Sequence, residues 1–342
     1  MRAAVLESFG APLVVRDVPE PTAAEGEALV RVRATGVCAT DLKLAAGALG
    51  RDDVLPIVPG HEVAGELVED ADGLRSGQRV ACHIYDSCER CAWCRAGRPT
   101  LCPDRVRIGL ERNGGLAEYV AVPVKALLPF SSDLSFEAAA VSMDAVASPW
   151  SALHGHAAVR SGETVVVVGA GGLGLNAVQI ARAAGAEVAI LDPVPERRRV
   201  ALGAGAGLAV APEEAGEVRS WSDGGADVAF EASGRRAGFD AGIACLRRGG
   251  RMVVCGYEPG VEYGVESSRL VLEEIAIMGS VSASYERARA ALESVERGDL
   301  VPTILDRLPL EEVNTALERL AGGDVLGRLV IEPGAAGEGG AT

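Results

Sequence analysis

Residues 164–174 read Thr-Val-Val-Val-Val-Gly-Ala-Gly-Gly-Leu-Gly, and this stretch decides the fold. A run of four valines is typical of a strand buried on both faces, as parallel sheets require. The glycines that follow at once have the spacing G-x-G-x-x-G, at Gly169, Gly171 and Gly174. Apolar residues then recur at helical spacing, and a second apolar run ends in Asp192. The order of these features predicts a βαβ unit.

The glycine loop has the residue types that dinucleotide binding needs. Gly169 permits a tight turn, Gly171 lets the backbone approach a pyrophosphate, and Gly174 lets the helix pack on the strand. The phosphates would lie at the positive end of the following helix, beside Gly172 and Leu173. We therefore predict that these five residues bind the cofactor.

Asp192 predicts which dinucleotide binds. It follows the second apolar run, where an acid can accept hydrogen bonds from both ribose hydroxyls of an adenosine. Its charge would repel a 2′-phosphate, which favours NAD over NADP. Arg197 and Arg198 lie nearby in the sequence and can bind a 2′-phosphate, so NADP remains the alternative.

Composition and charge exclude several classes of partner. The chain has 342 residues, enough for two domains, and its 48% hydrophobic and 24% charged content is that of a globular protein. A formal charge of -15 argues against nucleic acid or an anionic membrane. No apolar run reaches about 18 residues without glycine or charge, so we expect no transmembrane helix. Met1–Glu7 is too short and too soon charged for a signal peptide, so a reducing cytoplasm is expected.

The pattern changes along the chain. Residues 1–150 show short β-strands between Gly, Pro and acidic turns, without a regular alternation of strand and helix. These strands are predicted at Val5-Leu6, Leu13–Val15, Ala28–Val32, Glu62–Val68, Arg79–Cys82 and Ala117–Val122. Residues 151–284 alternate strand and helix, with strands predicted at 164–168, 187–191, 208–210, 227–230, 251–255 and 275–279. The second region fits a doubly wound parallel sheet with its ligand at the carboxyl ends of the strands.

The last part of the chain is expected to return to the first domain. Two amphipathic helical patterns, Tyr285–Glu296 and Leu310–Leu320, precede a final strand, Gly327–Ile331. The Gly/Ala-rich tail Gly334–Thr342 is predicted to be disordered.

Four cysteines form the most specific motif of the sequence. Cys88, Cys91, Cys94 and Cys102 have the spacing C-x2-C-x2-C-x7-C. In a reducing compartment we expect no disulfides. Four thiolates this close suit a closed tetrahedral zinc site, which would be structural because no position remains for a substrate. A redox dithiol or an iron–sulfur cluster is the alternative.

A second set of candidate ligands is dispersed along the chain. Cys38, His61 and Asp144 each have an ordinary explanation when taken singly. A lone Cys is usually a core residue, a lone His a turn residue, and an Asp before a helix its cap.

Taken together, these motifs resemble the zinc-dependent medium-chain dehydrogenase/reductase family, which includes alcohol dehydrogenases, over about residues 1–333. The resemblance rests on the four-cysteine loop, the glycine loop, Gly36-Val-Cys38, Gly60-His61-Glu62-Val-Ala-Gly65, Gly114-Gly115-Leu-Ala-Glu-Tyr119 and Gly327-Arg328. It implies an α/β fold with two domains. Residues 1–150 would form a GroES-like β-rich catalytic domain to which 285–342 returns, and residues 151–284 a Rossmann NAD-binding domain.

The resemblance also implies a catalytic zinc. The positions of Cys38 and His61 hold this ion in the family, and Glu62 is a neighbour that can swing in as a ligand. The third ligand is commonly a Cys, and the matching position here is Asp144, an acid that some members use. A thiolate, a carboxylate and a neutral imidazole would cancel the charge of Zn²⁺ and leave the fourth position open for an alcohol.

A proton path and further cofactor contacts follow from the same resemblance. The hydroxyl of Thr40 would accept the proton of the alcohol, and a His three residues later often continues the relay. Lys43 takes that place here, and a lysine relays only when its pKa is lowered; an exposed surface lysine is the alternative. Arg328 matches a phosphate-binding Arg, Arg197 matches a basic residue beside the adenosine ribose, and Ala39 replaces a basic phosphate contact.

The expected function is an NAD-dependent, zinc-dependent alcohol dehydrogenase with two zinc ions per chain. It would transfer hydride between NAD and an alcohol, with formation of an aldehyde or ketone, as a homodimer or homotetramer. One alternative is a family member that reduces a conjugated C=C or C=N bond. Another is a non-catalytic zinc protein that binds NAD(H). The presence of Thr40 and the candidate ligands favours the dehydrogenase.

Overall fold

In the computed structural model, which describes residues 1–49 and 52–334, the chain forms two compact units. Unit 1 consists of Met1–Asp144, Ser284–Gly298 and the chain from Ile304, and unit 2 of Ala145–Ala283 and Asp299–Thr303. From residue 335 the tail that was predicted to be disordered lies outside the described residues. Among the helices that the structure describes, none has the length and apolarity needed to cross a membrane.

Unit 2 contains a six-stranded sheet in which every neighbouring pair is parallel, as predicted. The strand order is β12-β11-β10-β13-β14-β15. The bounds are β10 Thr164–Val168, β11 Glu187–Leu191, β12 Leu208–Val210, β13 Ala226–Glu231, β14 Leu246–Val254 and β15 Ala276–Gly279. Strands β10, β11 and β12 have the predicted bounds, whereas β14 begins earlier than the predicted residue 251.

The glycine loop connects β10 to helix α5, Gly172–Ala183, and β11 follows, so the predicted βαβ unit is confirmed. The four valines of β10 are buried. Gly169 has a φ of +92°, which favours glycine, and a Cβ on Gly174 would collide with the carbonyl oxygen of Gly169. These two glycines therefore shape the turn and the close packing of helix on strand.

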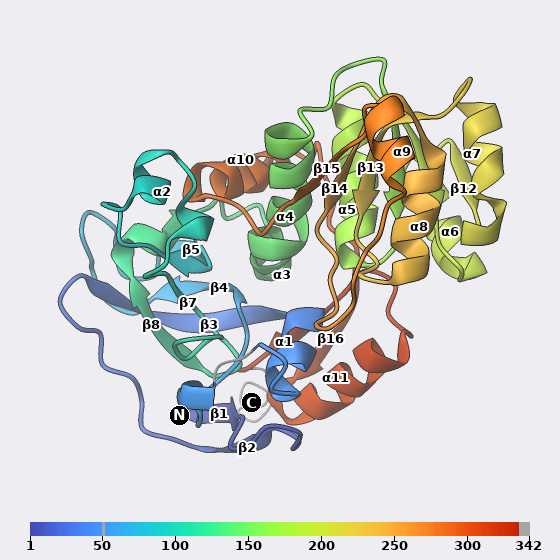
Figure 1. The fold of residues 1–342 in the computed structure, drawn as a ribbon. Helices are drawn as coiled ribbons and strands as arrows, with labels where there is room; N and C mark the ends of the chain where they lie inside the picture. The colour runs from blue at the N-terminus through green and yellow to red at the C-terminus, as the bar shows by residue number, and fades with distance from the viewer. Residues whose placement is uncertain (50–51, 335–342) are drawn as a thin grey trace. The chain divides into compact units, whose positions relative to one another are not determined.

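Further helices flank the strands of unit 2 (Figure 1). They are α6 Pro195–Gly203, α7 Ala215–Trp221, α8 Arg236–Cys245 and α9 Ser267–Leu272. The core between sheet and helices contains apolar residues from β10, β11, β13 and α8, including Val166, Ala189, Ala229 and Phe239. Burial of both faces explains why these strands read as continuous apolar runs.

Unit 1 contains a seven-stranded sheet of order β16-β17-β3-β4-β5-β9, with β8 also paired to β3. Two further two-stranded sheets pair β1 with β2 and β6 with β7. The bounds are β1 Arg2–Val5, β2 Val14–Asp17, β3 Glu27–Val37, β4 Glu62–Leu67, β5 Arg79–Cys82, β6 Tyr85–Asp86, β7 Val106–Arg107, β8 Tyr119–Pro123, β9 Leu127–Pro129, β16 Ile304–Pro309 and β17 Arg328–Glu332. Each predicted strand of residues 1–150 overlaps one of these strands, but β6, β7, β9 and β16 were not predicted.

The helices of unit 1 are short, apart from two near the C-terminus. They are α1 Ala39–Ala45, α2 Ala92–Arg95, α3 Phe136–Val141, α10 Tyr285–Glu296 and α11 Val313–Gly322. The predicted helix Tyr285–Glu296 is confirmed, and the predicted helix 310–320 begins as a 3-10 turn before α11. Single 3-10 turns lie at Asp52–Val54, Pro99–Leu101, Val124–Ala126, Pro212–Glu214 and Leu310–Glu312.

Residues 136–156 form one helical stretch that the sequence did not predict. After α3 come a π-helical turn, Ser142–Val146, then α4, Ala147–Trp150, and a second π-helical segment, Ser151–His156. Asp144 therefore lies inside a helical stretch. The ordinary explanation of a lone Asp, as the cap of a following helix, therefore does not apply to Asp144.

Candidate metal centres

Four side chains that can ligate a metal converge in unit 1. Cys38, His61, Glu62 and Asp144 each offer one ligand atom, and these atoms all lie within 4.8 Å of one another. β3 ends directly before Cys38, and β4 begins at Glu62. Because these strands pair antiparallel with Gly36 opposite Glu62, residues far apart in the sequence meet at one end of the sheet.

The cluster is compact and largely buried. Asp144 Oδ2 lies 3.5 Å from Cys38 Sγ and 3.8 Å from His61 Nε2. Cys38 and His61 are at most 4% exposed, and Glu62 is fully buried. A thiolate, an imidazole and carboxylates are a donor set that suits Zn²⁺. The dispersed residues that the sequence suggested as ligands are thus brought together.

Asp41 supports this cluster, although the sequence analysis missed it. Its Oδ2 accepts the backbone N–H of Cys38 at 2.8 Å, and its Oδ1 lies 3.2 Å from Nδ1 of His61. A proton on Nδ1 would leave Nε2, which faces Asp144, free to bind a metal. Burial alone would lower the pKa of His61, but the Asp41 carboxylate and bonds to Asp144 and Cys38 raise that pKa well above its usual value. The available signal was an acid in the first turn of α1, three residues after its cap.

Arg328 is a second neighbour of the cluster. β17 pairs antiparallel with β3, with Leu329 opposite Val37, which brings the start of β17 next to Cys38. The guanidinium is buried, and its Nη2 lies 2.6 Å from Glu62 Oε1 and 3.3 Å from both Cys38 Sγ and Asp144 Oδ2. We predicted a cofactor phosphate contact for Arg328, but these contacts are to candidate metal ligands.

The charges of the cluster fit a divalent cation. Burial raises the pKa of Glu62 to about 7, with Arg328 opposing this effect. When ionised, Cys38, Glu62 and Asp144 carry three negative charges, and Arg328 carries one positive charge. Zn²⁺ would cancel the remaining two. The Oε2 atom of Glu62 is buried and has no hydrogen-bond partner among the described residues, which leaves an acceptor available to a cation.

Thr40 and Lys43 both lie on α1, which starts after Cys38. Thr40 Oγ1 is 3.6 Å from Cys38 Sγ, so its hydroxyl borders the candidate ligands. Lys43 is three residues further along the helix and therefore lies on the same side of it. Both side chains are half-buried. Their place in a proton relay stays a prediction.

Cys88, Cys91, Cys94 and Cys102 form the second cluster, with their sulfur atoms within 4.8 Å of one another. None of the four is in a disulfide, and the Sγ atoms of Cys91 and Cys94 are 3.5 Å apart. Cys91 caps the short helix α2, where its sulfur accepts the backbone N–H of Cys94. This bond lowers the pKa of Cys91 to about 7. A thiolate at neutral pH is the form that binds metal.

Asp192 lies directly after β11 and beside the glycine loop. Its Oδ2 accepts the backbone N–H of Ala170, and its Oδ1 accepts that of Val194, both at 2.8 Å. Arg197 Nη1 is 3.9 Å from Oδ2, and Arg198 donates to the backbone carbonyl of Asp192. The structure therefore brings together the loop, the acid and both arginines that the sequence suggested for the adenosine end of a dinucleotide.

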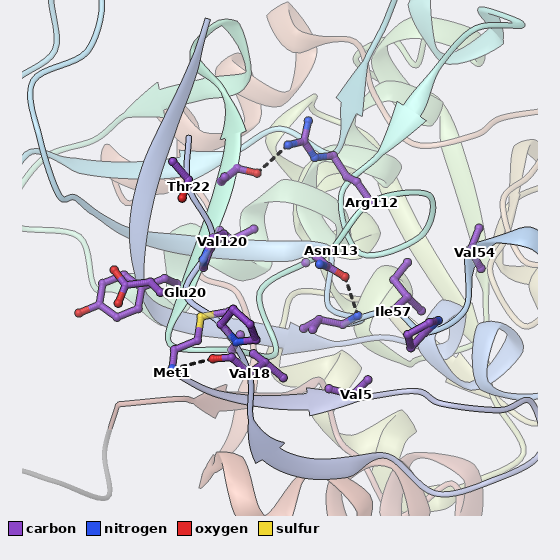
Figure 2. Close-up of a pocket in the computed structure, with 18 of the residues that line it drawn as sticks. Met1, Val5, Val18, Glu20, Thr22, Val54, Ile57, Arg112, Asn113 and Val120 are labelled. Carbon is purple, nitrogen blue, oxygen red and sulfur yellow. Dashed lines mark hydrogen bonds between the residues drawn. The ribbon is translucent and has the colours of Figure 1, made fainter. Parts of the chain in front are cut away.

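A cavity of about 650 Å³ in unit 1 does not coincide with either metal cluster. Its described lining includes none of the predicted site residues. Figure 2 shows Arg112 and Asn113 among this lining. Arg112 bonds Glu27 at 2.6 Å, and Asn113 accepts the backbone N–H of Val58 at 3.0 Å. These polar groups are already paired within the protein.

Two family models match the chain. The alcohol dehydrogenase GroES-like domain matches residues 24–132, and the zinc-binding dehydrogenase domain matches residues 172–297. These matches confirm the predicted combination of a GroES-like domain and a Rossmann domain.

Similar proteins cover almost the whole chain. The alcohol dehydrogenase of Geobacillus stearothermophilus is 35% identical over 97% of this chain and 99% of its own length. The L-threonine 3-dehydrogenase of Streptomyces coelicolor is 33% identical over 94% and 97%, and the acryloyl-coenzyme A reductase of Metallosphaera sedula 30% over 97% and 99%. The crystal structure of an NAD-dependent alcohol dehydrogenase, 31% identical, superposes with a TM-score of 0.93 over 98% of this chain and 100% of that one. The chain therefore belongs to the zinc-dependent medium-chain dehydrogenase/reductase family of oxidoreductases, which includes the alcohol dehydrogenases.

Proposed function

We propose that this protein is an NAD-dependent alcohol dehydrogenase that interconverts an alcohol and its aldehyde or ketone. The observation that carries the proposal is the convergence of Cys38, His61 and Asp144 beside the hydroxyl of Thr40. Three ligands of this kind leave one position of a tetrahedral zinc for a substrate oxygen. Bound zinc would supply a Lewis acid that lowers the pKa of an alcohol, and bound NAD would accept the hydride.

The residues around the ligands have complementary tasks. Asp41 would hold His61 with Nε2 available for zinc. Arg328 would balance the charge of Glu62 and keep its Oε1 engaged. The carboxylate of Glu62 lies within 4.8 Å of the other three ligand atoms, so Glu62 would act as a further ligand when its bond to Arg328 opens.

Thr40 would accept the proton that the alcohol loses. Its Oγ1 is 3.6 Å from the sulfur of Cys38. A substrate oxygen that fills the open position of the zinc would therefore come within reach of the Thr40 hydroxyl. Lys43 would continue the transfer along the same side of α1.

The cofactor in this proposal is NAD rather than NADP. The carboxylate of Asp192 is fixed beside the glycine loop by two backbone N–H groups. A negative charge held there repels a 2′-phosphate and accepts hydrogen bonds from ribose hydroxyls. The nearby Arg197 is the feature that would weaken this preference.

The four-cysteine cluster would hold the second, structural zinc. Residues 88–102 contain only the four-residue helix α2 and a 3-10 turn, so their order depends on contacts other than regular secondary structure. A closed zinc site supplies such contacts.

The edge strand β15 supports assembly into a homo-oligomer. It is the last strand of the unit 2 sheet, and most of its residues are exposed. Large apolar side chains at the end of α9, shortly before β15 in the chain, are also exposed, with Val271 at 68% and Leu272 at 77%. An open edge with apolar neighbours favours pairing with a second copy. Size-exclusion chromatography with light scattering tests this, since Ile277→Lys on β15 should shift the protein to monomer.

Reduction of a conjugated double bond is the second candidate, because one relative at 30% identity is named acryloyl-coenzyme A reductase. Such a reaction needs NAD(P)H and a place for the unsaturated substrate. The presence of all three candidate zinc ligands, Cys38, His61 and Asp144, favours alcohol chemistry.

The direct experiment measures NADH formation with primary, secondary, cyclic and polyhydroxylated alcohols, including threonine, and repeats it with NADP⁺. Our proposal predicts NAD⁺-dependent turnover with at least one of these groups. Inactivity with every alcohol, together with reduction of an α,β-unsaturated thioester, would establish the second candidate instead.

A further inference from the structure

Asn176 makes two hydrogen bonds that no part of the proposed chemistry uses. It lies in the second turn of α5 and is only 3% exposed. Its Nδ2 donates to the carbonyl of Ala145 and to the carbonyl of Gly172, each at 2.9 Å. Because both partners are acceptors, the amide nitrogen must face them, and the reversed orientation of the side chain would be repulsive. All three residues belong to unit 2.

The carbonyl of Ala145 needs this donor because of Pro149. Residues 147–150 are helical, and an ordinary residue at position 149 would donate its N–H to the carbonyl four residues earlier. Proline has no N–H, so it cannot donate to Ala145. Ala145 is fully buried, where an unpaired carbonyl is costly. Asn176 therefore provides the bond that the helix itself cannot make.

This bond holds the chain next to a candidate zinc ligand. Ala145 directly follows Asp144, and both lie in the π-helical turn Ser142–Val146. π-helical turns are uncommon and occur often at functional sites. A fixed Ala145 carbonyl restricts the backbone of this turn and, through it, the direction of the Asp144 side chain.

We propose that Asn176 is a positioning residue that fixes the π-helical turn and so orients Asp144 for zinc. The proposal rests on the proposed function, since it takes Asp144 as a ligand. Asn176 itself touches neither metal nor substrate. Its second bond, to the carbonyl of Gly172, ties the same amide nitrogen to the first turn of α5.

The test compares zinc retention in Asn176→Ala and Asn176→Leu with the wild type. Both substitutions remove the donor, and leucine keeps a comparable volume. We expect a chelator to release the catalytic zinc about tenfold faster, as is typical when support for a ligand is lost. Release of the four-cysteine zinc should not change. In protein loaded with cobalt(II), the visible absorption of the catalytic site should also shift, because it reports ligand geometry.

Pro149→Ala supplies the decisive rescue. It returns an N–H four residues after Ala145, so the helix can make its own bond. The double variant Asn176→Ala/Pro149→Ala should regain most of the slow zinc release. Gln179→Ala is the matched control: this residue also lies on α5, and its amide bonds the backbone of Val301. The Gln179→Ala variant should lose a comparable number of hydrogen bonds, but its catalytic zinc should be released no faster than in the wild type.

The outcomes separate this proposal from the proposed function. Wild-type protein that binds only the four-cysteine zinc would mean that Asp144 is not a ligand, and both would fail. Wild-type protein with two zinc ions, and Asn176 variants with unchanged release and cobalt absorption, would overturn the positioning role alone. Faster release that Pro149→Ala does not reverse would also overturn it.

Discussion

The guanidinium of Arg328 lies 2.6 Å from the carboxylate of Glu62, and both side chains are almost fully buried. The same Nη2 atom is 3.3 Å from the sulfur of Cys38 and from Asp144. A buried carboxylate without a cation is unstable. Arg328 is therefore the internal counter-ion of the candidate zinc site.

Replacing Arg328 by alanine should destabilise the protein strongly. The change leaves the Glu62 carboxylate buried without its partner, a loss of about 3–5 kcal/mol in the free energy of unfolding. Urea denaturation of zinc-depleted protein at pH 8 measures it. The double variant Glu62→Gln/Arg328→Ala removes the unpaired charge and should be more stable than Arg328→Ala. Equal stability of these two variants would contradict the pairing.

Asp144 should be required for the catalytic zinc and not for the structural one. Asp144→Ala removes one charge and one ligand, so we expect one zinc per chain in place of two and loss of alcohol oxidation. Asp144→Cys offers a thiolate at the same place and should retain two zinc ions. Metal analysis and turnover together check this. Turnover near the wild-type level in Asp144→Ala would eliminate this ligand.

The inner strands β10, β11 and β13 of unit 2 could be predicted from the sequence because they are almost fully buried. Their apolar runs are continuous, and β10, β11 and β12 have the predicted bounds. The helical stretch 136–156 could not be predicted, since Pro149 interrupts the pattern. Its π-helical segments also depart from the period of 3.6 residues.

The site was predictable only in part. Cys38, His61 and the four cysteines could be suggested because they stand in short motifs. The contact of Arg328 with Glu62 depends on the pairing of β17 with β3, which joins distant parts of the chain. Asp41 was missed since a single acid in a helix has no distinctive pattern. The need of the Ala145 carbonyl for Asn176 emerges only once the helix around Pro149 is known.

Asp192 should control the choice between NAD and NADP. Asp192→Asn removes the charge but keeps an acceptor for one of the two backbone N–H groups that the carboxylate binds. The ratio of kcat/KM for NAD⁺ to that for NADP⁺ should fall by about tenfold, which corresponds to ~1.4 kcal/mol. An unchanged ratio would show that the acid does not discriminate at the ribose.

The ion pair of Glu163 with Arg251 should make the stability of unit 2 depend on pH. Burial alone would raise the pKa of Glu163, but bonds from Arg251 and the backbone of Arg160 lower it. A lowered pKa stabilises the fold above the usual glutamate value, and this contribution is lost as the pH falls below about 4.3. Glu163→Gln should thus be less stable than the wild type at pH 7 and approach it at pH 3. Thermal unfolding at both values measures this; an equal difference at both would contradict it.

Removal and return of zinc test the central claim most directly. A chelator should extract the zinc held by Cys38, His61 and Asp144 before the one enclosed by four thiolates. Protein with one remaining zinc should form no NADH from alcohol, and one equivalent of added zinc should restore the rate. Full turnover by protein that carries only the four-cysteine zinc would contradict the proposed function.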